Sequence, residues 1–133
     1  PDTPVTLTWD NGAGLVFERT LKIDRNFVLS ITQKVTNNSD ASVTLFPYAA
    51  LVRQGAPAHA TTVGYEGPLG VFGTELEEVK YTDILKDGAQ TFSAQQGWIG
   101  FGEKYWLSAL LPQQNQVLDF SFRGQASNNP EDK

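Results

Sequence analysis

His59 is the only histidine of this 133-residue chain, and the chain contains no cysteine. A serine-type triad needs a histidine base, but His59 lies in a loop of small residues and no Gly-x-Ser-x-Gly motif occurs. A histidine-based metal site would need carboxylates at suitable spacing, which the neighbours of His59 do not provide. We therefore expect no catalytic residue, no metal site and no cofactor, and we interpret His59 as a solvated loop residue.

Three carboxylates cluster at Glu75, Glu77 and Glu78. Glycoside hydrolysis needs two carboxyl groups that face each other across a substrate. One strand would place Glu75 and Glu77 on one face and Glu78 on the other, which does not supply that arrangement. We interpret the cluster as a solvated strand edge that resists strand-to-strand aggregation.

Gly67, Gly70 and Gly73 are spaced in a way that could suggest a phosphate-binding loop. The Lys-Ser/Thr pair of such loops is missing, and no helix is predicted to follow directly. We expect these glycines to set a sharp bend or to let another backbone come close. The triplet at residues 37–39 matches the N-glycosylation pattern, but it also reads as a turn.

The aromatic side chains are the remaining candidates, since exposed tryptophan and tyrosine can stack on sugar rings or anchor a protein partner. We expect Trp9 and Trp106 to pack in the core, and we leave open whether Tyr65 and Trp98 face inward or outward. The predicted partner or ligand surface consists of four residues: Tyr65, Glu66, Glu77 and Trp98.

The elements that must position these residues follow a period of two along most of the chain, which is typical of half-buried strands. Strands are predicted over residues 5–10, 15–21, 27–36, 43–52, 77–81, 98–111 and 118–122, with one helical turn at 84–87. The run 98–111 is apolar on both faces from Tyr105, so we expect it in the centre of a sheet. The predicted fold is an all-β antiparallel sandwich over residues 1–125, followed by a flexible polar tail at 126–133.

The net charge of −5 and the pI of about 4.7 exclude two classes of partner. Nucleic-acid binding needs a basic stripe, and a polybasic grip on anionic lipid needs the same kind of cluster. The longest apolar run is also too short to span a bilayer, and position 1 is not methionine. We expect a processed or excised piece of a longer protein, held to a membrane, if at all, by helices absent from this chain.

Seven short strings occur in a fixed order along the chain. They are LTWDNGAGL at 7–15, VTNNS at 35–39, FPY at 46–48, YEGPLGV at 65–71, EVKY at 78–81, GWIG at 97–100 and KYWLSALLP at 104–112. In this order they resemble the large periplasmic domain of the YidC membrane protein insertase family. The chain departs from the family pattern at Tyr65, where histidine would be expected, and at Gln96, where glycine is usual.

The resemblance implies a β-supersandwich related to galactose mutarotase, of which this chain is a partial copy, with residues missing chiefly before Pro1 and some beyond Lys133. It implies a parent in the bacterial inner membrane that inserts and folds membrane proteins, alone or with the Sec translocon and its SecDF accessory. The implied partners are therefore those translocon proteins or nascent membrane-protein clients. Open strand edges left by the missing residues would also favour a dimer.

Three functions stay open at this stage. The first is a non-catalytic docking or client-binding module. The second is a carbohydrate-binding module or an inactive mutarotase-like domain, which the aromatic residues favour. The third is a passive spacer, and fold relationship alone does not separate these three.

Overall fold

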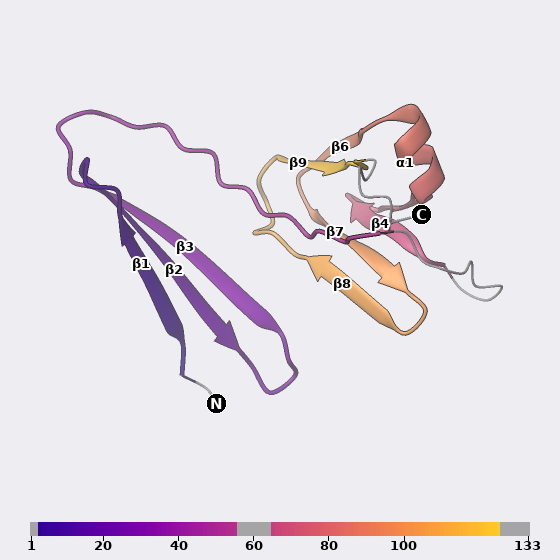
Figure 1. Cartoon of the computed structure of the whole chain (residues 1–133), viewed down its shortest axis with the longest axis horizontal. Helices are drawn as coiled ribbons and strands as arrows, with labels where there is room; N and C mark the ends of the chain where they lie inside the picture. The colour runs from indigo at the N-terminus through magenta and orange to yellow at the C-terminus, as the bar shows by residue number, and fades with distance from the viewer. Residues whose placement is uncertain (1–2, 56–64, 126–133) are drawn as a thin grey trace. The chain divides into compact units, whose positions relative to one another are not determined.

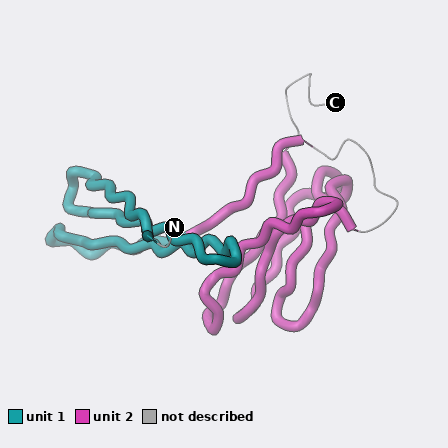
Figure 2. Tube along the Cα trace, turned by 90° about the horizontal axis from the view of Figure 1, so that it is seen from below, with its two compact units in different colours: residues 1–47 teal, residues 48–133 magenta. Residues whose placement is uncertain are grey.

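Two compact units make up the chain, residues 1–47 and residues 48–133 (Figure 2). The computed structural model describes residues 3–55 and 65–125. In this described part strands dominate, every strand pair is antiparallel, and one short helix is present. The mostly-β, antiparallel part of the predicted fold is therefore confirmed.

Unit 1 is a three-stranded sheet in the order β1-β2-β3 (Figure 1). Its strands are β1 (Val5–Asp10), β2 (Leu15–Ile23) and β3 (Leu29–Asn37). The turn between β1 and β2 forms because the side-chain oxygen of Asn11 accepts the N–H groups of Ala13 at 2.8 Å and Leu15 at 3.0 Å. This confirms the turn that the Asp-Asn-Gly sequence predicts.

The second turn of unit 1 is built in the same way. The Asp24 carboxylate accepts the N–H groups of Asn26 at 2.8 Å and Val28 at 2.9 Å. Phe27 lies inside this turn with φ of 63°, a left-handed conformation that a strand residue does not adopt. The predicted strand start at 27 is therefore wrong by two residues, and β3 begins at Leu29.

The sheet of unit 1 has one apolar and one polar face. The register places Trp9 opposite Phe17 and Phe17 opposite Val35, so these side chains share a face. The apolar face is formed by Val5, Leu7, Trp9, Leu15, Phe17, Leu21, Ile23, Leu29, Ile31 and Val35, with Arg19, Gln33 and Asn37 among them. The opposite face carries the Glu18–Lys34 ion pair at 2.6 Å.

Unit 2 contains a four-stranded sheet, a two-stranded sheet and a helix (Figure 1). The larger sheet has the order β5-β4-β7-β8, and β6 pairs with β9. The elements are β4 (Gly67–Phe72), β5 (Glu75–Glu78), α1 (Tyr81–Asp87), β6 (Gln90–Ala94), β7 (Gly97–Glu103), β8 (Trp106–Leu110) and β9 (Leu118–Phe122).

The buried hydrophobic core of the described residues lies in unit 2. Val79, Ile84 and Phe122 form a buried cluster, against which Phe72 and Phe92 pack. The rings of Phe72 and Phe92 are stacked with centroids 4.3 Å apart. Phe72 comes from the four-stranded sheet and Phe92 from the two-stranded one, so aromatic packing joins the two sheets.

The glycines of β4 and β7 allow the strands to pack closely. A Cβ atom on Gly70 would lie 2.7 Å from the carbonyl oxygen of Trp98, and one on Gly100 would collide with the carbonyl oxygen of Ser108. Real Cβ atoms do not come this close to a backbone oxygen. The expectation that the glycine series lets another backbone approach is confirmed at Gly70.

Several predicted elements are wrong. Residues 43–52 form no strand, because Pro47 lacks an N–H group and no strand of the described part pairs with this segment. The run 98–111 is two strands, β7 and β8, joined by a turn at Lys104 and Tyr105. Of these two strands only β7 is central, since β8 forms the edge of the sheet among the described residues.

Other boundaries moved, and two strands were missed. The strand predicted at 77–81 is β5 at 75–78, and the helix extends from Tyr81 rather than beginning at Ile84. The missed strands are β4, whose glycines weaken the strand pattern, and β6, whose sequence is mostly polar. The predicted tail at 126–133 and the loop that holds His59 lie outside the described residues.

Candidate functional site

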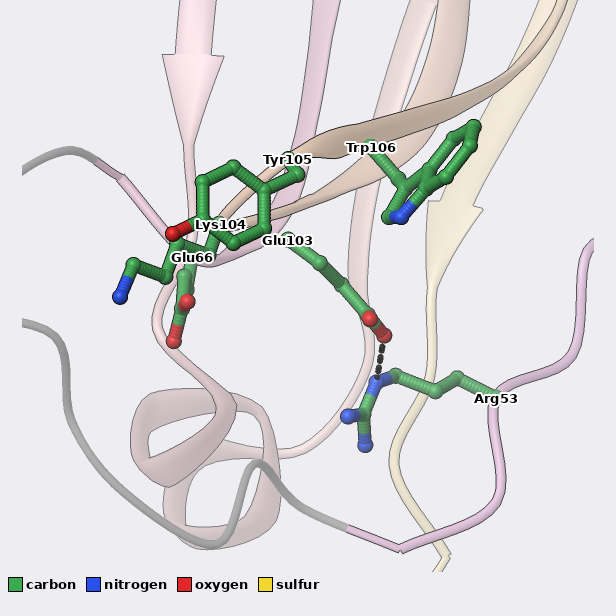
Figure 3. Close-up of a pocket in the computed structure, with 6 residues that line it drawn as sticks. All are labelled: Arg53, Glu66, Glu103, Lys104, Tyr105 and Trp106. Carbon is green, nitrogen blue, oxygen red and sulfur yellow. Dashed lines mark hydrogen bonds and ion pairs between the residues drawn. The ribbon is translucent and has the colours of Figure 1, made fainter.

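A small open cavity of about 130 Å³ lies beside the turn between β7 and β8 (Figure 3). Glu103 ends β7, Trp106 begins β8, and the turn residues Lys104 and Tyr105 lie between them. Glu66, which precedes β4, and Arg53 complete the lining. The cavity therefore joins three segments that are distant in sequence.

Arg53 holds the polar side of this cavity in place. Its Nε donates to Glu103 Oε1 at 2.6 Å (Figure 3), and another guanidinium nitrogen donates to the carbonyl oxygen of Gly55. The guanidinium carbon also lies 5.8 Å from the ring centre of Tyr81. Burial raises the pKa of Tyr81, and the Arg53 charge opposes that rise. A charge-assisted hydrogen bond and a cation–π contact thus orient one guanidinium.

The aromatic side of the cavity faces solvent. Tyr105 is 79% exposed and Trp106 is 77% exposed. Lys104 Nζ lies 5.2 Å from the ring centre of Tyr105, so a cation covers part of that ring. The expectation that Trp106 packs in the core is wrong, because the residue starts an edge strand directly after a turn. Trp9 is also 63% exposed and does not confirm its predicted core position.

Tyr65, the first residue of the predicted surface, forms hydrogen bonds through its hydroxyl group within unit 2. The hydroxyl oxygen lies 2.7 Å from the carbonyl oxygens of both Pro68 and Val79, and its one proton is shared between them. Burial raises the pKa of Tyr65 from 10.0 to about 12. The residue is half-buried, so its hydroxyl supports the start of β4 rather than facing a ligand.

The other three predicted residues do not form one surface. Glu66 lines the cavity. Glu77 pairs with Gly70 on β4, whereas Trp98 pairs with Val71, the next residue of that strand. Neighbouring rows of a sheet point to opposite faces, so Glu77 and Trp98 lie on opposite faces of the four-stranded sheet.

Sequence reasoning missed Arg53, Glu103 and Lys104 as parts of the cavity. A signal for the turn was present, because Gly102-Glu103-Lys104 interrupts an otherwise apolar run. No local signal identifies Arg53, whose partner Glu103 is fifty residues away.

A second surface of interest is the face of the four-stranded sheet turned away from the core. Phe72 and Ile99 point to the core, so the alternating residues Val71 and Trp98 point outward. This outer face consists of Leu69, Val71, Leu76, Glu78, Trp98, Leu107 and Ala109, with Gly100 and Gly102 between them. Leu76 and Leu107 are each 58% exposed, so the face presents accessible apolar surface at both edges.

The two edges of this sheet differ in charge. The edge strand β5 carries Glu75, Glu77 and Glu78, as the sequence interpretation of a solvated acidic edge expects. The opposite edge strand β8 reads Trp-Leu-Ser-Ala-Leu and has no charged residue. An uncharged edge is the one that can accept a further strand.

Across residues 3–55 and 65–125, no group of three or more acidic or histidine side chains is placed to hold a metal ion. Over the same ranges, no helix has the length and apolar character required to cross a bilayer.

Comparison with known proteins gives a consistent result. The family model of the YidC periplasmic domain matches residues 1–131. A membrane protein insertase YidC from Ruegeria sp. (strain TM1040) is 47% identical over 123 residues, which cover 84% of the chain and 20% of the relative. The proteins of the same name from Beijerinckia indica subsp. indica and Granulibacter bethesdensis are each 42% identical over 130 residues. These matches cover 93% and 92% of the chain, and 22% of each relative. The chain therefore spans about a fifth of the length of these relatives.

Proposed function

The chain belongs to the YidC periplasmic domain family, and from this premise we propose that it is a docking module for extended, apolar segments of membrane-protein clients. The family match confirms the resemblance seen in the sequence and the periplasmic location. It also agrees with the expectation that the chain is not an enzyme, because the relatives are insertases. That the chain takes part in membrane-protein insertion, and that it contacts the inserted clients, are both part of this proposal.

The observation that carries the proposal is the apolar outer face of the four-stranded sheet next to the uncharged edge of β8. An extended segment that pairs with β8 gains backbone hydrogen bonds with little sequence specificity. Its alternate side chains then lie beside Leu107 and Ala109 on the outer face. The acidic β5 edge disfavours the same pairing on the other side.

Leu107 and Leu76 give a matched pair for the test. Both are 58% exposed on the same face, but Leu107 lies on β8 and Leu76 on β5. In a full-length YidC-family protein carrying this domain, a photocrosslinking probe at Ala109 should capture a nascent membrane protein. Leu107→Lys should reduce that crosslink about tenfold, because a lysine on an edge strand disfavours pairing with a further strand. Leu76→Lys should leave it within about twofold, because Leu76 lies on the other edge of the sheet.

Equal losses in both variants would mean that the face binds without strand addition at β8. No crosslink to a client at Ala109, with the protein active, would reject the docking function at this edge. A band to a Sec translocon subunit or to SecDF would assign the edge to those partners instead of clients. A band to a second copy of the chain would support the predicted dimer, which sedimentation at high concentration would then have to confirm.

We propose in addition that the unit 1 sheet is one layer of the β-supersandwich that the family resemblance implies. A three-stranded sheet with one apolar face needs a covering layer for stability. Trp9 and Leu7, more than half exposed on that face, support this view. Amide hydrogen exchange should show strong protection of the unit 1 strands in the full-length protein. Unit 1 strands that stay unprotected in the full-length protein would reject the sandwich assignment.

A further inference from the structure

We propose that the cavity beside the β7–β8 turn binds one pyranose ring of a neutral saccharide. The carbohydrate alternative considered from the sequence centred on Tyr65 and Trp98, whereas the structure gathers the relevant chemistry elsewhere. The lining contains two aromatic rings, two carboxylates, one guanidinium and one ammonium group (Figure 3).

The charges of the lining sum to zero. Glu66 and Glu103 carry two negative charges, and Arg53 and Lys104 carry two positive ones. A phosphate group would meet two carboxylates, and a simple cation would meet an ammonium and a guanidinium. A neutral ligand with many hydroxyl groups avoids both conflicts, because each hydroxyl can donate to a carboxylate and accept from a cation.

The polar side chains of the lining differ in how firmly hydrogen bonds hold them in place. Arg53 and Glu103 are fixed by their mutual bond at 2.6 Å, which leaves the second oxygen of Glu103 as an acceptor. Glu66 enters the same cavity from the segment before β4. Fixed donors and acceptors around a small cavity are the usual source of orientation in ligand sites.

Trp106 supplies the apolar contact. Its ring is 77% exposed at the cavity rim, and its indole N–H can donate as well. The ring of Tyr105 is already covered in part by Lys104, so Trp106 is the freer stacking surface. The C–H faces of a pyranose are apolar, so they can stack on the exposed indole ring of Trp106 and remove its apolar surface from water.

The size of the cavity limits the ligand. A volume of about 130 Å³ is well below that of a site for a drug-sized molecule, so one ring enters and the rest of a chain stays outside. We expect a dissociation constant on the order of millimolar for a free sugar, because few atoms are in contact. Glu103 alternates with Phe101 and Ile99 along β7, so the cavity lies on the face opposite Leu107. The saccharide site thus lies on the face opposite Leu107, and it shares Trp106 with the edge strand β8.

The three indole N–H signals of Trp9, Trp98 and Trp106 allow a direct test by two-dimensional NMR of the 133-residue chain. The probes are glucose, N-acetylglucosamine, maltose and cellobiose. At least one should shift the Trp106 signal in a saturable way and leave the Trp9 signal in place. Trp106→Ala should weaken binding about tenfold or more. Glu66→Gln should weaken it severalfold, whereas the matched controls Trp9→Ala and Glu18→Gln should not.

Three results would overturn the proposal. The first is an unchanged Trp106 signal with all four sugars. The second is an equal shift with glycerol, which would indicate an adventitious additive only. The third is a saturable shift with an apolar peptide and none with the sugars, which would assign the cavity to a protein partner. Unchanged backbone signals away from the cavity show that each variant is folded, so a loss of binding can be interpreted.

Discussion

Tyr65 and Gly67 depend on each other, and substitution of both should reveal the coupling. Tyr65→Phe removes the hydroxyl that donates to the carbonyl oxygens of Pro68 and Val79. The oxygen of Pro68 still accepts the N–H of Val79 at 2.9 Å, so mainly the Val79 oxygen loses a donor. One lost partner of this kind costs about 1–2 kcal/mol of folding free energy.

Gly67→Ala acts on the same hydroxyl from the other side. A Cβ atom at residue 67 would lie 2.7 Å from the Tyr65 hydroxyl oxygen and 3.0 Å from the Val79 carbonyl oxygen. Overpacking of this size costs about 1–3 kcal/mol. In the double variant the closest contact is gone, so the combined loss should fall short of the sum by about 1 kcal/mol.

Urea unfolding in a Trp9→Phe background measures this coupling. The remaining tryptophans, Trp98 and Trp106, then both report on unit 2. The free energies of unfolding come from linear extrapolation for each of the four proteins. Single-variant losses that add within about 0.5 kcal/mol would refute the reasoning, because independent sites add to that accuracy.

Three further predictions follow from the same structure. Burial raises the pKa of Tyr65 from 10.0 to about 12, so the folded state keeps the phenol proton to a higher pH than the unfolded state does. The free energy of unfolding should therefore fall as the pH rises from 10 to about 12. The urea midpoint of the Tyr65→Phe variant should fall less over the same range. Gly100→Ala should lower the free energy of unfolding in urea by about 2 kcal/mol or more, because the added Cβ meets a backbone oxygen. Gly102→Ala, whose Cβ would have contacts no closer than 3.5 Å, should lower it by less than about 1 kcal/mol. Asn11→Ala should lower the free energy of unfolding by about 1–2 kcal/mol, measured by Trp9 fluorescence, because two turn N–H groups lose their acceptor. The control Glu18→Gln, in an exposed ion pair, should lower it by about 1 kcal/mol or less.

The strands that local pattern could predict are those with alternating residues and clear turn chemistry. β1 and β9 were predicted at their observed bounds, because apolar and polar residues alternate and turn residues flank them. The start of β2 was also predicted, but the strand runs on to Ile23 where a turn was expected from Lys22. The segment 43–52 has a comparable pattern but no partner strand in the described part of the chain. A segment forms a strand only when a partner strand pairs with it, and its own sequence does not identify that partner.

The candidate cavity shows the same limit at the level of side chains. Glu66 was singled out from the sequence, and Tyr105 and Trp106 were noted as aromatic. Their association with Arg53 depends on an ion pair across fifty residues. Tyr65 was expected at a surface, but its hydroxyl is taken up by two backbone oxygens that only the folded register brings near. Residue type suggests chemistry, and tertiary contacts decide whether it is available.

The amphipathic sheet of unit 1 has a consequence for experiments with a fluorescent hydrophobic dye such as ANS. Enhanced dye emission is commonly read as a sign of a molten globule with loosened side-chain packing. In this chain Leu7, Trp9 and Ile31 are each more than half exposed on one face of a regularly paired sheet. Where this face of the unit 1 sheet is uncovered, dye emission comes from an ordered surface, and near-ultraviolet circular dichroism is needed to tell the two cases apart.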